Sequence, residues 1–168
     1  MSTIAVGALS FTFDDDWQVS KYDDWSFYRK RFQRVRSEVK AIDILAIASD
    51  RTTWFIEVKD YRRHPRTKPI NLADEVAHKV FDTLAALLPA GVNGDVHSET
   101  AIAKAALNGR ALRVVLHLEQ PATHSKLFPR AIDPANVLMK LKQLVKPIDP
   151  HPLVVETSHM ASLTWTVT

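Results

Sequence analysis

Residues 41–59 read AIDILAIASDRTTWFIEVK, and this stretch decides the predicted fold. It contains two runs, 41–48 and 53–59, that are rich in the branched and aromatic residues typical of β-strands. Between the two runs, Ser49 and Asp50 have side chains that favour a turn. The stretch therefore predicts a β-hairpin.

Three ionisable residues, Asp43, Glu57 and Lys59, interrupt these otherwise apolar strands. Because strand side chains alternate between faces, Glu57 and Lys59 are expected on one face and Val58 on the other. A three-residue loop over 49–51 would pair Ala48 with Thr52 and place Asp43 opposite Glu57. A two- or four-residue loop would place Asp43 opposite Val58 instead, unless a bulge restored the register. The arrangement thus requires an odd loop or a bulge.

The residues before the hairpin give weaker signals. Apolar residues alternate with polar ones over 10–19, which predicts a strand or a hairpin. Over 25–35 the aromatic residues have helical spacing but are also compatible with a strand. This second segment is left open between helix and strand.

The residues after the hairpin predict an alternation of helices and strands. Asn71 is the expected N-cap of a helix that runs to about Leu88 and is ended by Pro89 and Gly91. The remaining predicted elements are a helix from Ser98 to Asn108–Gly109, a strand at 112–118, a helix from Asp133–Pro134 to Val145, and short strands at 153–156 and 163–167. The fold class is therefore α+β, written more broadly α/β, with a mixed β-sheet whose central hairpin is flanked by helices.

Length and composition limit the classes of protein. The chain has 168 residues, which favours a single domain over 1–168. It has no cysteine, which excludes zinc–cysteine modules, cysteine nucleophiles and disulfide scaffolds. Its four glycines lack the spacing of a phosphate-binding loop or a dinucleotide fingerprint. No stretch is long enough to span a membrane, so we expect a soluble cytoplasmic protein without a membrane partner.

Positive charge is concentrated in two parts of the chain. The net charge is only +3, but 13 of the 22 lysines and arginines lie in the first 70 residues. They gather in a first basic segment, residues 29–40, and a second basic segment, residues 59–68. Such clusters are compatible with an ordinary solvated surface or with contacts to nucleic-acid phosphates.

The spacing of the charged strand residues resembles the PD-(D/E)XK nuclease superfamily, which has the restriction-endonuclease-like fold. The resemblance rests on Asp43, thirteen intervening residues, and then Glu57-Val58-Lys59, with Ile42 in place of the proline. The order of hairpin, helix and strand also resembles the family core over about residues 20–120. Residues 121–168 would then be a C-terminal elaboration.

The resemblance implies a metal-dependent enzyme. Asp43, Glu57 and the backbone carbonyl of Val58 would hold Mg²⁺ or Mn²⁺, with Lys59 beside the attacking water. The implied activity is phosphodiester hydrolysis of nucleic acid, with DNA favoured over RNA. One alternative is a catalytically inactive module of the same fold that binds nucleic acid or a protein partner. Another is an accessory domain in which the charged residues are only a buried network of ion pairs.

Further residues are candidates for the same site. We expect Arg29, Lys30, Arg62, Arg63 and Lys68 to contact nucleic-acid phosphates. Candidates for an additional carboxylate ligand are Asp23, Asp24, Glu38 and Glu75. A homodimer is compatible with a nuclease of this size, and no residue defines its interface.

Overall fold

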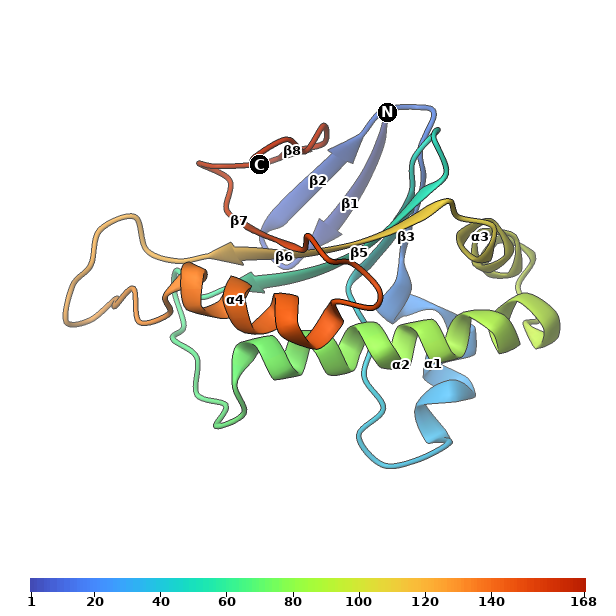
Figure 1. Cartoon of the computed structure of the whole chain (residues 1–168), viewed down its shortest axis with the longest axis horizontal. Helices are drawn as coiled ribbons and strands as arrows, with labels where there is room; N and C mark the ends of the chain where they lie inside the picture. The colour runs from blue at the N-terminus through green and yellow to red at the C-terminus, as the bar shows by residue number, and fades with distance from the viewer.

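The structure is a computed structural model that describes residues 1–168, and it is built of three layers (Figure 1). Helices form one outer layer, a five-stranded sheet lies in the middle, and a three-stranded sheet covers its other face. In spatial order, the middle sheet consists of β3 (Gln18–Lys21), β4 (Ile44–Ile47), β5 (Thr52–Asp60), β6 (Ala111–Glu119) and β7 (Leu153–Val155). The smaller sheet consists of β1 (Ser2–Val6), β2 (Leu9–Phe13) and β8 (Thr166–Val167).

The predicted hairpin is confirmed as β4 and β5. The Ala48 amide donates to the Thr52 carbonyl at 3.0 Å, and Ile44 lies opposite Ile56. Arg51 closes the three-residue loop with a φ of 65°, in the left-handed region that tight turns require. β4 is shorter than predicted, because residues 41–43 precede the strand and only 44–47 pair with both neighbours.

The middle sheet is mixed, as predicted. β3, β4 and β5 are antiparallel, whereas β6 is parallel to β5 and β7 is parallel to β6. The crossover from β5 to β6 contains α2 (Leu72–Asn93) and α3 (His97–Leu107). Asn71 caps α2 by accepting a hydrogen bond from the Ala73 amide at 2.9 Å.

Helix α2 is longer than predicted, because Pro89 does not end it. The helix continues to Asn93, and Gly94 donates its amide to the Ala90 carbonyl at 3.1 Å. Ala90 and Gly91 are buried, and Gly91 lies beside Lys104 and Leu107 of α3. This packing holds the last turn of the helix despite the proline, whose missing amide removes one helical hydrogen bond.

Most other elements lie where the sequence predicts them. α4 (Pro134–Val145) starts at the predicted cap, where Asp133 accepts from the Ala135 amide at 2.9 Å. The undecided segment is helical, with α1 (Ser26–Lys30) between the short 3₁₀ helices η1 (Tyr22–Asp24) and η2 (Phe32–Arg34). The segment 10–19 does not form a hairpin, because its two strands, β2 and β3, belong to different sheets.

The middle sheet buries apolar residues on both faces. Leu45, Phe55 and Leu116 pack under the helices, whereas Ile56 and Val115 pack against the smaller sheet. Figure 1 shows α2 running beneath the strands and the smaller sheet above them. None of the helices has the length and apolar character needed to cross a membrane. The α+β class with a mixed sheet is confirmed, and a restriction-endonuclease-like core stays a prediction.

Candidate functional site

The charged residues of β5 lie on the face of the sheet that packs against α2. Glu57 is completely buried, and its Oε1 lies 2.9 Å from Lys59 Nζ and 2.6 Å from Lys79 Nζ. Lys59 comes from the same strand, two residues on, so the strand alternation brings the pair to one face as predicted. Lys79 comes from α2, and sequence analysis did not assign it to the site.

Asp43 joins this cluster from the residue before β4. The register of β4 and β5 pairs Ile44 with Ile56, so its next step places Asp43 opposite Glu57, as the three-residue loop predicts. Asp43 Oδ2 accepts a hydrogen bond from the Val58 amide at 2.7 Å. The side chain of Asp43 thus extends the ladder between the two strands beyond the last paired residue of β4.

Glu75 of α2 completes the cluster with three ion pairs. Its carboxylate lies 3.0 Å from Lys59 Nζ, 2.9 Å from Lys68 Nζ and 2.6 Å from the Arg66 guanidinium. Glu75 is only 2% exposed, so these cations neutralise a charge that has little contact with water. We refer below to Asp43, Glu57, Lys59, Glu75 and Lys79 as the ion cluster.

The two glutamates of the ion cluster are perturbed in opposite directions. Burial and the negative charge of Asp43 raise the pKa of Glu57 to about 7, although Lys79 and Lys59 act in the other direction. Burial also raises the pKa of Glu75, but hydrogen bonds from Lys68, Lys59 and Arg66 outweigh it and lower that pKa to about 2. Burial lowers the pKa of Lys59, and the two glutamates more than compensate and raise it overall.

The donor atoms of this cluster match a Mg²⁺ site poorly. Mg²⁺ prefers an octahedron of oxygen atoms, with one or two carboxylates and several waters. Here two lysines already occupy the side of Glu57 that a cation would take. Buried carboxylate oxygens without a hydrogen-bond partner remain on Glu57, Glu75 and Asp23, and that of Glu75 already lies against the Arg66 guanidinium. No group of three or more His, Cys, Asp or Glu residues is placed to hold a metal ion. A site for Mg²⁺ or Mn²⁺ on Asp43, Glu57 and the Val58 carbonyl stays a prediction, and no step below depends on it.

The other predicted carboxylates lie in different places. Asp23 lies near Asp43, and burial together with the Asp43 charge raises the Asp23 pKa. Asp24 forms ion pairs with Lys21 and Arg29, and it is exposed. Of the four candidates, Glu75 is the one that contacts Lys59.

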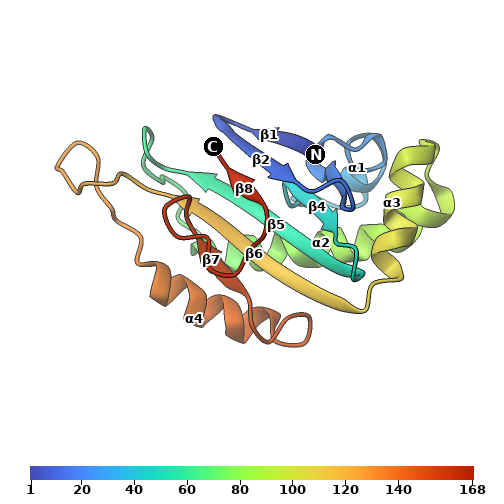
Figure 2. The same cartoon turned by 90° about the horizontal axis from the view of Figure 1, so that it is seen from above.

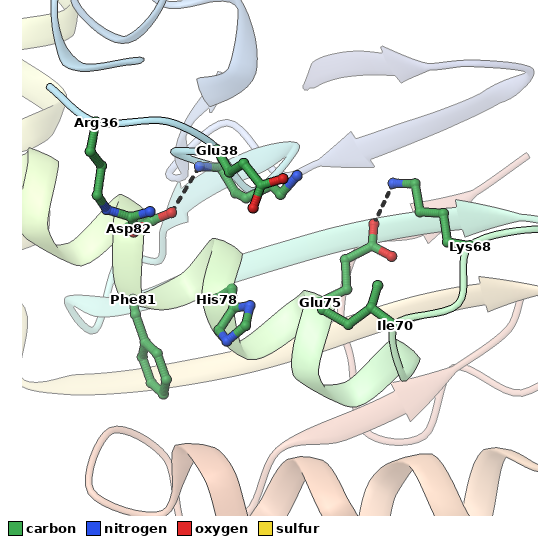
Figure 3. A pocket seen from close by; sticks show the side chains of 9 residues that line it. Arg36, Glu38, Lys68, Ile70, Glu75, His78, Phe81 and Asp82 are labelled. Carbon is green, nitrogen blue, oxygen red and sulfur yellow. Dashed lines mark hydrogen bonds and ion pairs between the residues drawn. The ribbon is translucent and has the colours of Figure 1, made fainter. Parts of the chain in front are cut away.

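A polar groove opens beside the ion cluster (Figure 3). It lies between α2 and the segment 36–40 and has a volume of about 480 Å³. Arg36 and Lys40 of the first basic segment share this groove with Lys68 of the second, so the fold brings the two segments together. The groove is lined by Arg36, Glu38, Lys40, Lys68, Ile70, Glu75, His78, Phe81 and Asp82.

Two further hollows adjoin the groove. One, of about 440 Å³, shares Lys40 with it and is also lined by Arg29, Asp43 and Lys79. The other, of about 290 Å³, shares Lys68 with it and is also lined by Lys59. We refer to the groove and these two hollows together as the basic channel.

Not all predicted phosphate-binding residues lie in the basic channel. Arg29 and Lys68 line it, although Arg29 pairs with Asp24 and Lys68 pairs with Glu75. Arg62 is held by Asp60 at 2.6 Å. Lys30 and Arg63 are exposed, form no ion pair and line none of the three hollows. Sequence analysis missed Lys40 as a site residue, although it belongs to the first basic segment.

Comparison with known proteins relates this chain to a tRNA ligase. The chain is 32% identical over 180 aligned positions to a cysteine–tRNA ligase of Neisseria meningitidis. The match covers 87% of this chain and 26% of that protein, so the chain spans about a quarter of the length of this relative. No family model matches the chain, and no solved structure matches it.

This relative corrects the predicted function. The expectation of a Mg²⁺-dependent nuclease, with an inactive module of the nuclease fold as its alternative, is wrong, because the matched protein is named as a ligase for cysteine and tRNA. The geometry accounts for the error. Asp43, Glu57 and Lys59 do come together, but Lys59 is engaged in ion pairs with Glu57 and Glu75. The same residue spacing is therefore compatible with a buried network of ion pairs.

Proposed function

We propose that this chain is a tRNA-binding accessory module that acts in connection with aminoacylation. The observation that carries the proposal is the match of 87% of the chain to part of a cysteine–tRNA ligase. Because that part is only 26% of the relative, an auxiliary role is favoured over the whole ligase reaction. Binding of the tRNA is the task that such a module can perform alone.

The basic channel offers cations to a polyanion, although six carboxylates line it beside seven lysines and arginines. Phosphate groups dominate the affinity of proteins for nucleic acids, and lysine and arginine provide most of the contacts. In the groove, Lys40 forms no ion pair, and the side chain of Lys68 is 58% exposed despite its contact with Glu75. Phe81 lines the same groove and is 40% exposed, so its ring is available to stack on an unpaired base of an RNA loop.

The ion cluster has a structural role in this proposal. Lys79 of α2 binds Glu57 of β5, and Lys59 of β5 binds Glu75 of α2. These two reciprocal contacts fix α2 against the strand, and α2 forms one wall of the groove. The cluster would therefore hold the shape of the channel while the more exposed cations meet the RNA.

A binding experiment tests the proposal directly. We would measure fluorescence anisotropy of a labelled tRNA and of a DNA duplex of equal length, from about 50 to 200 mM salt. We expect tighter binding of the tRNA, with an affinity that falls steeply as salt is added. The double variant Lys40→Gln, Lys68→Gln should bind tRNA about tenfold more weakly and reduce the salt slope by about 1 to 2.

A matched control separates the channel from general positive charge. The double variant Lys104→Gln, Lys142→Gln removes the same charge from exposed residues of α3 and α4 that form no ion pair. It should bind tRNA within about twofold of the unaltered chain, as expected for charges outside the contact. Equal losses in the two double variants, or tighter binding of the DNA duplex, would contradict the proposal.

A further inference from the structure

A second cavity lies at the opposite end of β5 from the ion cluster. It has a volume of about 600 Å³ and is bounded by α2, α3, the start of β6 and the turn at residues 148–151. Figure 2 shows that the turn after α4 and the end of α3 flank the start of β6. No residue of the basic channel lines this cavity.

The floor of this cavity is apolar. Phe55, fully buried in β5, lies at its base, together with Leu84 and Leu87 of α2. Leu112 and Ile148 add apolar surface from β6 and the turn after α4. Small-molecule sites in proteins are concave, mostly apolar and about 300–1,000 Å³ in volume, with a few polar groups that fix orientation. The cavity has this size and this kind of lining.

The rim of the cavity carries a positive charge that forms no direct ion pair. Arg113 is engaged, since it binds Asp149 at 3.2 Å and donates to the His151 carbonyl at 2.9 Å. Asp149 is also satisfied, because it accepts from the Val114 amide. Arg110, in contrast, is exposed and makes no direct ion pair, and the one carboxylate on which its charge is seen to act is Asp50 of the hairpin turn. A guanidinium beside an apolar cavity is suited to a carboxylate, sulfonate or phosphate group.

The geometry points to a binding site for an organic anion with an apolar ring or chain. The apolar part would fill the cavity above Phe55, where it loses contact with water, and the acidic group would pair with Arg110. This site is separate from the proposed tRNA contact. Its occupation therefore requires none of the residues of the basic channel.

Two related dyes test the site and its charge preference. Anilinonaphthalene sulfonate carries an apolar ring system and an anion, and phenylnaphthylamine has similar rings without the charge. We expect one saturable binding event for the sulfonate, followed by its fluorescence. The variant Arg110→Gln should weaken sulfonate binding by about tenfold and leave the neutral dye unchanged. The matched control Lys104→Gln removes an exposed charge outside the cavity and should alter neither affinity.

Filling the cavity provides the second arm of the test. Ala111 is exposed at the start of β6 and lines the cavity, so Ala111→Trp should block both dyes. Leu107→Trp of α3 offers the same obstruction from a residue that is 47% exposed, should the first variant fold poorly. Absence of saturable binding, or binding that persists in a folded blocking variant, would overturn the inference. Both variants should retain tRNA binding, so failure of this site is distinguishable from failure of the proposed function.

Discussion

Glu75 forms more ion pairs than any other carboxylate in this protein, and this makes it the most informative single residue. The substitution Glu75→Gln keeps its shape but leaves Arg66 and Lys68 without a counter-charge. Removing one member of a buried ion network is strongly destabilising, and we expect a loss of about 3 kcal/mol in the free energy of unfolding at pH 7. Urea denaturation measures this loss.

The same residue should control stability in acid. Its pKa is lowered to about 2 in the folded chain, below the value of about 4.3 expected in an unfolded chain. A lowered carboxylate pKa stabilises the fold above the unfolded value, and this stabilisation is lost as the pH falls from about 4.5 toward 2. Glu75→Gln should therefore lack this acid-dependent loss. Asp74→Asn, the neighbouring carboxylate that pairs with Lys140, is the control and should retain it.

Glu57 should give a pH dependence of the opposite sign. Its pKa is raised to about 7, so between about pH 4.5 and 7 the folded chain binds a proton that the unfolded chain has released. The contribution of Glu57 to stability therefore falls as the pH rises through this range. We expect Glu57→Gln to flatten the decline in melting temperature between pH 5 and 8. An unchanged decline in the variant would show that another group causes it.

Pro89 provides a prediction at the scale of an element. Proline inside a helix removes a backbone hydrogen bond, yet α2 continues past Pro89 to Asn93. Because the last turn is already held by α3, Pro89→Ala restores the missing donor without changing the packing partners. We expect a gain of about 1–3 kcal/mol, measured by urea denaturation. A loss of stability would mean that the ring itself contributes to packing between the two helices.

The elements that sequence analysis predicted well are those governed by local signals. The turn residues and alternating strands of 41–59 are sufficient for the hairpin and its register, and the caps Asn71 and Asp133 mark the starts of α2 and α4. The predicted end of α2 was wrong, because packing against α3 allows the helix to continue past Pro89. The smaller sheet could not be predicted, since it pairs strands from opposite ends of the chain.

The candidate site likewise combines residues that local sequence signals predict with residues that only the tertiary fold brings together. Asp43, Glu57 and Lys59 meet because strand register brings them together, and register is a local property. Lys79 and Arg66 join them through the tertiary placement of α2 and the loop before it, which no spacing in the sequence specifies. Whether a charged strand face binds a metal or forms ion pairs depends on these added cations. The function therefore could not be derived from the three strand residues alone.

At the scale of the whole molecule, Trp165 connects the smaller sheet to the rest of the chain. It is 3% exposed, and its ring lies 5.4 Å from Phe13 and 5.2 Å from Trp54 between ring centroids. Removing a buried tryptophan costs about 3–5 kcal/mol, so Trp165→Ala should destabilise the protein by this amount. The control Leu127→Ala alters a residue that is 81% exposed and should change stability by less than about 0.5 kcal/mol.

Two spectroscopic probes show whether this loss reaches every layer. Trp17 and Trp54 pack near the smaller sheet, but Trp25 is buried in the core under the helices, so the measurement is made with Trp25→Phe in both chains compared. The fluorescence then reports on the side of the smaller sheet, whereas far-UV circular dichroism reports mainly on the helices across the middle sheet. Since the middle sheet contributes to both apolar cores, we expect the two transitions of Trp165→Ala to coincide at a lower urea concentration than in the unaltered chain. If only the fluorescence transition moved, the smaller sheet would unfold separately, and the helices with the basic channel would be stable without it.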